Sequence, residues 1–447
     1  MNKNGSGGPR GRAWVVAVSM GYGHQRTAYP LRDLSPDGAV LNANDYEGIP
    51  RRDRELWKDA ARFYGAVSRF KRVPIVGPLI FGAYDRLQRI MSLYPKRDLS
   101  RPTRSLGEIF SFIQKGWGKD WVDRLAEKRI PLVTTFFMTA FMAEFFGYPG
   151  DIFCVTADAD VARDWAPRDP RHTRIHYCAS TNRVFERLIL YGVPEKNIHM
   201  TGYPLPKENI GGPSLRTLKT DMRTRLVNLD PRRKYIHDYA PVIAKNFGRL
   251  PGRSARPLTI MFSVGGAGAQ KEIGIALVKS LKERILAKDV AVILAAGAGR
   301  GSADRFLEAL QPMGFDGSPG SGVEILWAMG LSDYFSQFNA ALRATDILWT
   351  KPSELSFYCG LGIPIIMAPP IGSQEDLNRE WLLKVGAGMD QYDPAYTHEW
   401  LFDYLKDGWF AEAAMHGFLD AEKMGAYHIE RLIARKSSTS ISGVRTS

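Results

Sequence analysis

The fold is decided by one stretch near the start of the chain, Trp14-Val15-Val16-Ala17-Val18-Ser19-Met20-Gly21-Tyr22-Gly23-His24-Gln25-Arg26-Thr27-Ala28. An apolar run of strand length leads into a glycine-rich turn, and a helical segment follows. Such a strand–turn–helix unit is typical of a parallel α/β sheet, whose turns lie at the carboxyl edge where these sheets bind ligands. The stretch therefore predicts a sheet edge that presents His24.

The alternation of strands and helices continues in two blocks. In residues 13–205 we expect strands at 14–19, 39–43, 131–135, 152–156 and 174–179. In residues 256–396 we expect them at 258–264, 290–295, 323–326, 346–349 and 364–367. Strands that alternate with helices favour a parallel sheet in each block. The fold class is therefore α/β, with two Rossmann-like domains that face each other across a cleft.

The remaining segments connect or extend these two domains. Residues 206–255 change to a polar composition and are interpreted as a connection with one or two helices. Residues 397–435 are interpreted as C-terminal helices that pack back on the first domain. The polar ends, residues 1–12 and 436–447, are expected to be disordered tails.

The composition is that of a soluble two-domain protein. The chain has 447 residues, too many for a single core. Its three cysteines show no CxxC spacing, which favours buried thiols in a reducing compartment. No apolar run approaches the length of a membrane-spanning helix, and the start of the chain lacks the pattern of a signal peptide. We therefore expect a cytoplasmic protein.

A basic and aromatic stretch covers residues 51–104, with 14 Lys and Arg against 5 Asp and Glu. Cations interleaved with aromatic rings fit a surface that rests on anionic lipid headgroups. Nucleic acid would suit the same composition, but no zinc-ligand spacing or RNA-binding motif supports it. The remaining alternative is a solvated face with aromatic residues in the core. The residues expected to face the membrane are Trp57, Arg62, Phe63, Arg69, Phe70, Lys71 and Arg72.

The first loop offers the candidate for acid–base chemistry. Gly21 and Gly23 permit a tight turn around Tyr22 and leave backbone amides near the start of the next helix. His24 follows directly, and histidine can take a proton from an attacking hydroxyl near neutral pH. The alternative is that His24 only caps or packs.

A second glycine loop follows the expected strand at 258–264. Its glycines, Gly265, Gly266 and Gly268, would let the backbone approach a phosphate at the start of the next helix. The loop is not of the dinucleotide type, because no acidic residue ends the next strand. The alternative is a tight strand–helix turn that binds nothing.

Two further loops carry polar residues at helix starts. Ser353 could donate a hydrogen bond to a phosphate, and Glu354 could accept one from a ribose. Gln374 and Glu375 could bind sugar hydroxyls, and the same helix carries Asn378. Helix capping is a sufficient alternative for both loops.

Acidic residues after the expected strand at 152–156 are minor candidates. Asp158 and Asp160 could orient His24 or an acceptor, or could cap a helix. No cluster has the spacing of a metal site, so no metal is expected.

Taken together, these residues resemble the GT-B glycosyltransferases that build glycolipids, glycosyltransferase family 28 in particular. Monogalactosyldiacylglycerol synthases and processive diacylglycerol glucosyltransferases are the nearest likeness, and the lipid-linked N-acetylglucosamine transferase of peptidoglycan synthesis is more distant. The likeness runs over about residues 13–390 in motif order. The segments that carry it are Ser19–Ala28, the stretch after Trp57, Val155–Trp165, Tyr191–Pro204, Asp346–Lys351, Gln374–Asn378 and Lys384–Gly388.

The resemblance implies a GT-B fold and an inverting, metal-independent transfer of a sugar from a UDP-sugar to a lipid hydroxyl. His24 would be the base, with Gly21, Tyr22, Gly23 and Asp158 around the acceptor. The loops at Gly265 and Ser353 would hold the diphosphate, and Gln374 and Glu375 the sugar. No cofactor is implied beyond the nucleotide-sugar as co-substrate. The partners would be this donor, a lipid or lipid-linked acceptor and the anionic inner face of the cell membrane, without nucleic acid.

The chain departs from that family at three places. Pro352-Ser353-Glu354-Leu355 replaces a glycine-rich run, Phe357 stands near the position of the ribose-binding carboxylate, and Thr135-Phe136 replaces a His-Pro pair. These departures keep two alternatives open. One is a nucleotide-sugar epimerase or hydrolase on the same fold, and the other is a non-catalytic relative that binds lipid or nucleotide.

Overall fold

The computed structural model describes residues 13–70, 90–264 and 270–442, and for residues 61–70, 373 and 437–442 it describes the backbone alone. The chain divides into two compact units, which are described separately. Unit 1 comprises Met1–Pro204, Ile371–Leu377 and Met424–Ser447, and unit 2 comprises Leu205–Pro370 and Asn378–Lys423. The first turn of one helix, α15, thus belongs to unit 1 and its remainder to unit 2.

Unit 1 is built on a six-stranded parallel sheet in the order β2-β1-β3-β4-β5-β6. Its strands are β1 (Trp14–Ala17), β2 (Leu41–Asn42), β3 (Leu132–Thr134), β4 (Ile152–Val155), β5 (Ile175–Ala179) and β6 (Ile198–Met200). The central strands are almost continuous apolar runs, as expected where both faces of a parallel sheet are covered.

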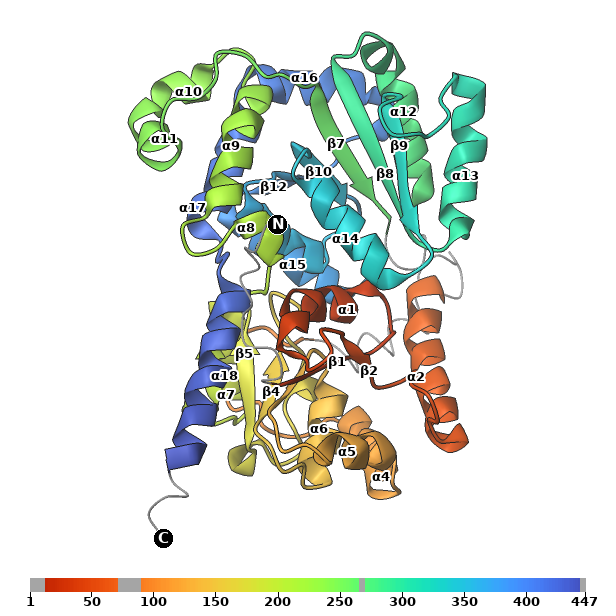
Figure 1. Cartoon of the computed structure of the whole chain (residues 1–447), viewed down its shortest axis with the longest axis vertical. Helices are drawn as coiled ribbons and strands as arrows, with labels where there is room; N and C mark the ends of the chain where they lie inside the picture. Colours follow the sequence, from red (N-terminus) through yellow and green to blue (C-terminus); the bar gives the residue numbers. More distant parts are fainter. Residues whose placement is uncertain (1–12, 71–89, 265–269, 443–447) are drawn as a thin grey trace, which may run out of the picture. The chain divides into compact units, whose positions relative to one another are not determined.

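Helices cover both faces of this sheet. Its α-helices are α1 (Tyr22–Ala28), α2 (Arg51–Phe70), α4 (Arg104–Gln114), α5 (Lys119–Ala126), α6 (Phe137–Phe145), α7 (Asn182–Leu190) and α18 (Gly425–Ser442), and its 3-10 helices are η1 (Tyr29–Leu34), η2 (Arg163–Trp165), η3 (Pro170–His172) and η4 (Glu195–Asn197). On one face Ala426, Ile429 and Ile433 of α18 pack in one apolar cluster with Val15 and Ala17 of β1. Leu31 and Leu34 of η1 belong to the same cluster, and Figure 1 draws α18 as the blue helix near the C-terminus. The α18 helix continues beyond Lys436, where a tail was expected.

Unit 2 contains a second six-stranded parallel sheet, in the order β12-β11-β10-β7-β8-β9. Its strands are β7 (Leu258–Ser263), β8 (Val290–Ala298), β9 (Val323–Ala328), β10 (Ile347–Thr350), β11 (Ile365–Met367) and β12 (Gly388–Asp390). Its helices are α8 (Lys207–Ile210), α9 (Arg216–Leu229), α10 (Lys234–Asp238), α11 (Ala240–Phe247), α12 (Lys271–Leu286), α13 (Arg300–Leu310), α14 (Leu331–Leu342), α15 (Ser373–Val385), α16 (Thr397–Lys406) and α17 (Trp409–Asp420), with 3-10 helices η5 (Gln311–Met313), η6 (Glu354–Leu361) and η7 (Pro394–Tyr396).

The two parallel sheets confirm the predicted α/β class with two Rossmann-like folds. Ten of the twelve strands coincide with an expected strand to within a few residues. The sequence did not reveal β6 and β12, which are three-residue strands at the outer edge of each sheet. Such strands are too short to show apolar periodicity, and their pairing depends on the neighbouring strand. Within the described residues, no helix has the length and apolar character to span a bilayer.

Candidate active site

A cavity of about 150 Å³ lies in unit 1 at the carboxyl edge of its sheet. The loops after β1, β3 and β4 supply most of its walls, and the start of α15 completes it. Its lining residues are Met20, His24, Phe136, Phe137, Asp158, Ala162, Asp164, Trp165 and Gln374. Three residues selected from the sequence, His24, Asp158 and Gln374, are therefore brought together here.

The position of His24 follows from the turn after β1. Gly21 has a φ of 108°, a backbone conformation that favours glycine, and it directly precedes α1. Thr27 anchors the helix, since its hydroxyl donates to the carbonyl oxygen of Gly23 at 2.8 Å. His24 lies in the first turn and is half-buried, which leaves its ring at the cavity wall.

A reciprocal pair of hydrogen bonds fixes the His24 ring. Its Nδ1 lies 2.7 Å from the carbonyl oxygen of Thr135, while the Thr135 hydroxyl donates to the His24 carbonyl at 2.9 Å. A carbonyl oxygen can only accept, so Nδ1 must carry the proton. In the neutral ring, Nε2 then bears the basic lone pair. The turn after β3 thus selects the tautomer that a general base requires.

Aromatic rings enclose the imidazole. Phe136 meets it edge-on at 4.8 Å between ring centroids, and Trp165 lies at 6.5 Å. Phe137 packs against Trp165 at 5.4 Å. The wall beside the base is therefore apolar, and it suits a ligand that presents a hydroxyl next to an apolar surface.

The acidic residues near the cavity have different roles. Asp158 and Asp164 line it, but the carboxylate of Asp164 also accepts hydrogen bonds from the hydroxyls of Thr103 and Ser105. Asp160 points elsewhere and forms a buried ion pair with Arg187 at 2.7 Å. Asp158 thus remains a candidate for the site, whereas Asp160 is structural.

The polar residues of α15 separate into two groups. Gln374 lines the cavity with His24. Glu375 accepts a hydrogen bond from the backbone amide of Ile371 at 2.7 Å, which closes the turn before the helix. Asn378 is buried and belongs to unit 2.

The loop after β10 in unit 2 behaves as a helix start. Ser353 accepts a hydrogen bond from the amide of Leu355 at 3.4 Å, and Glu354 follows in the first turn of η6. Phe357, near the position where the resembled family has a carboxylate, is buried against Trp381 at 4.8 Å. The capping alternative is therefore realised at Ser353.

Several predicted site residues lie outside the described residues. Gly265, Gly266 and Gly268 are among them, and so are Lys71 and Arg72. For Arg62, Phe63, Arg69 and Phe70, the structure describes the backbone of α2 but no side chain. These assignments stay predictions.

The prediction that Trp57 faces a membrane is wrong. Its side chain is only 2% exposed and contacts Trp117 edge-on at 4.8 Å in the core of unit 1. Helical spacing places Trp57 on the apolar face of α2, which packs into the core. Its basic neighbours in the sequence lie on other sides of the helix and do not predict its exposure.

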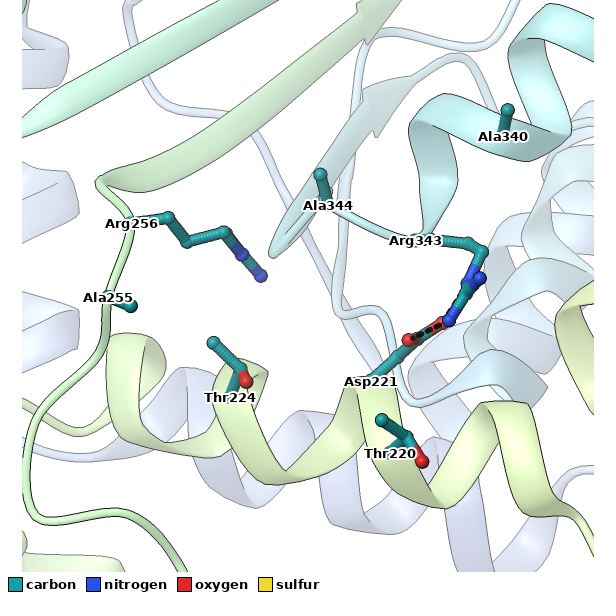
Figure 2. A pocket seen from close by; sticks show the side chains of 8 residues that line it. All are labelled: Thr220, Asp221, Thr224, Ala255, Arg256, Ala340, Arg343 and Ala344. Atoms are coloured by element: carbon teal, nitrogen blue, oxygen red, sulfur yellow. Dashed lines mark hydrogen bonds and ion pairs between the residues drawn. The ribbon is translucent and has the colours of Figure 1, made fainter.

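A second cavity, of about 530 Å³, lies in unit 2 and is wider and more open (Figure 2). Its walls come from α9, from the residues just before β7 and from the end of α14. Figure 2 shows Arg343 directed to Asp221, an ion pair of 3.0 Å. Arg256 also reaches the cavity and forms an ion pair with the buried Asp346 at 2.6 Å. This cavity adjoins the amino ends of β7 and β10, whereas parallel sheets bind ligands at the carboxyl ends.

Some residues of the unit 1 cavity were not selected from the sequence, namely Met20, Phe136, Phe137, Ala162, Asp164 and Trp165. Trp165 stood within a segment that resembles the glycosyltransferases, which is a signal that could have found it. Phe136 was noted only as a departure. No metal site can be built from His, Cys, Asp and Glu within the described parts of the chain, where no three of them cluster suitably.

Comparison with known proteins gives a match over part of the chain and structural similarity over most of it. The model of a domain of unknown function, DUF6938, matches residues 248–428, and no curated protein matches. Among solved structures, MurG of Acinetobacter baumannii is 13% identical with a TM-score of 0.47, over 94% of this chain and 99% of that one. A UDP-GlcNAc 2-epimerase of Methanocaldococcus jannaschii, in complex with UDP-GlcNAc and UDP, is 12% identical with a TM-score of 0.42. The match covers 94% of this chain and 99% of that one. The lipopolysaccharide outer core galactosyltransferase WaaB is 13% identical with a TM-score of 0.33. That match covers 74% of this chain and 81% of the other.

Proposed function

We propose that this protein is an inverting, metal-independent glycosyltransferase that transfers a sugar from a nucleotide-sugar, UDP-linked, to the hydroxyl of a lipid or lipid-linked acceptor. The observation that carries the proposal is the His24 ring, held with its proton on Nδ1 by the Thr135 carbonyl and placed on the wall of a cavity. That arrangement provides a base at the edge of the sheet where ligands bind.

The reaction is a single displacement. His24 Nε2 takes the proton of the acceptor hydroxyl as its oxygen attacks the anomeric carbon. The bond from that carbon to the diphosphate breaks, and the diphosphate leaves with the electron pair. Attack opposite the leaving group inverts the configuration. Backbone amides and helix starts would stabilise the charge that develops on the diphosphate.

The acceptor would bind in unit 1. Phe136, Phe137 and Trp165 provide an apolar wall next to the base, which supports an acceptor with an apolar body. Asp158 and Gln374 line the same cavity and could hydrogen-bond hydroxyl groups.

The donor would bind in unit 2, where Ser353 and Glu354 begin η6 at the carboxyl edge of the sheet. Asn378 of the same unit would contribute to this proposed site. The glycines Gly265, Gly266 and Gly268 would do so as well, which stays a prediction because they lie outside the described residues. The protein would work at the inner face of the cell membrane as a peripheral protein.

Release of nucleoside diphosphate from a panel of sugar nucleotides tests the proposal, with and without anionic liposomes that contain diacylglycerol. Release that requires the liposomes supports transfer to lipid and identifies the donor. Release or isomerisation without any acceptor would instead support the hydrolase or epimerase. No reaction with any donor, and no shift of Tm on adding UDP, would leave the non-catalytic relative.

A further inference from the structure

A basic exposed surface of unit 2 lies on α10, α11 and the loop that follows. Residues 230–253 contain six Lys and Arg and two Asp. Figure 1 draws α10 and α11 away from the sheet of unit 2, beyond α9. We call the exposed side of these residues the α10–α11 face. Its cations are Arg232, Lys234, Lys245, Arg249 and Arg253.

Only one of the two acidic residues of this segment is exposed on the face. Asp230 is fully buried, and its carboxylate accepts hydrogen bonds from the backbone amides of Lys234 and Ile236 at 3.0 and 2.8 Å. Asp238 is exposed and lies 3.2 Å from His237. Within the described parts of the chain, no carboxylate forms an ion pair with the five cations. Their charge is therefore directed to the solvent.

Apolar side chains are exposed among these cations. Tyr239 is 48% exposed and Val242 is 38% exposed, and both precede Lys245 on α11. Ala240 and Pro241 are exposed in the same turn. A tyrosine and aliphatic groups with a ring of Lys and Arg are typical of surfaces that enter the headgroup region of a membrane.

The opposite side of the two helices is firmly anchored. Ile236, Ile243 and Phe247 are buried, and Phe247 packs against Phe418 of α17 at 4.9 Å. The guanidinium of Arg233 donates to the carbonyl of Pro251 at 3.2 Å and holds the following loop. The exposed residues thus sit on a preorganised support.

We infer that the α10–α11 face is a docking surface for anionic lipid bilayers. Its five cations complement negative headgroups, each strengthening binding by about fivefold near such a surface. Tyr239 and Val242 would insert beside the headgroups. The inference deepens the proposed function, which requires access to a lipid acceptor, but bilayer binding can be measured without any sugar transfer.

The test is co-sedimentation of the full chain with vesicles of phosphatidylcholine alone and of phosphatidylcholine mixed equally with phosphatidylglycerol. The wild type should bind the mixed vesicles and release as salt rises. Lys245→Gln with Arg249→Gln should weaken binding by about 25-fold. Val242→Ser, which keeps every charge, should weaken it by about threefold.

The matched control is Lys279→Gln with Arg305→Gln, which removes the same charge from exposed positions on α12 and α13 of the same unit. It should bind as the wild type does. Absence of vesicle binding, equal loss in the control, or an unchanged α11 variant would overturn the inference. Binding of single-stranded RNA by these residues without vesicle binding would also overturn it, in favour of a nucleic-acid partner.

Failure of this inference is distinguishable from failure of the proposed function. Transfer can be assayed with a detergent-dispersed acceptor, which needs no bilayer. Charge-dependent vesicle binding without transfer would contradict the glycosyltransferase and leave the docking surface intact. If the wild type and an α11 variant both transferred sugar in detergent and neither bound vesicles, the docking surface would be contradicted. The glycosyltransferase would then stand.

Discussion

The carboxyl edges of the two sheets differ although both sheets are parallel and six-stranded. In unit 1, the turns after β1, β3 and β4 direct His24, Phe136 and Asp158 into one cavity. In unit 2, the described residues after β10 stabilise the helix that they begin. Ser353 caps η6, and Phe357 packs on Trp381. A strand–turn–helix unit therefore does not by itself make a site. Side chains from several turns must converge.

The largest effect is expected from His24→Ala, which tests whether the convergence in unit 1 is catalytic. Loss of the base should lower transfer by about 100- to 10,000-fold, as measured by release of nucleoside diphosphate. Nucleotide binding and Tm should change little, because the ring is half-buried. His172→Ala removes an exposed histidine of the same unit and serves as the control. Transfer that survives in His24→Ala would contradict the base assignment.

Arg187→Leu tests whether the unit 1 edge depends on the buried pair behind it. The change leaves Asp160 buried without its partner, and it should cost about 3–5 kcal/mol of the free energy of unfolding. Arg183→Leu is the matched control, since Arg183 is 39% exposed and lies 3.9 Å from the same carboxylate. Its cost should stay below about 1 kcal/mol. Urea denaturation measures both, and equal losses would show that burial is not the cause.

Ser353→Ala asks whether the unit 2 edge also holds a ligand. The cap bond is long, at 3.4 Å, so the free energy of unfolding should fall by less than about 1 kcal/mol. A lost hydrogen bond to a diphosphate should weaken UDP binding by about tenfold in calorimetry. Ser336→Ala, at an exposed position of α14, is the control. Unchanged UDP affinity would show that Ser353 only caps η6 and does not bind the diphosphate.

The smallest effect concerns a histidine pair on β5 and β6 of unit 1. Burial, with the nearby charge of Lys436, lowers the pKa of His176 to about 4 from its ordinary 6.5, and burial also lowers that of His199. Between pH 6.5 and pH 4, His176 binds a proton in the unfolded chain but stays neutral in the folded chain. Stability should therefore fall as pH falls from 6.5 toward 4.

His176→Gln should flatten that slope when Tm is followed across this pH range. The exposed His172→Gln should retain it. A slope that is the same in all three proteins would show that other groups cause the pH dependence.

Much of the architecture was accessible from periodicity, since ten strands were anticipated. Short edge strands were not, because β6 and β12 depend on pairing rather than on their own composition. The candidate site was accessible only in part. His24, Asp158 and Gln374 were selected, but the aromatic wall was missed because its rings follow two other strands. Trp57 was misassigned, since its basic neighbours say nothing about which side of α2 is buried.

Local sequence patterns specify the two parallel α/β sheets and the position of a histidine after the first strand. Local rules suffice there, because an apolar run, a glycine turn and a helix specify their own connection. Which nitrogen of that histidine carries the proton depends instead on a tertiary contact. The carbonyl that holds Nδ1 belongs to Thr135, 111 residues away, and the sheet brings the two turns together by pairing β1 with β3. A contact between distant turns depends on strand order, which no local pattern encodes.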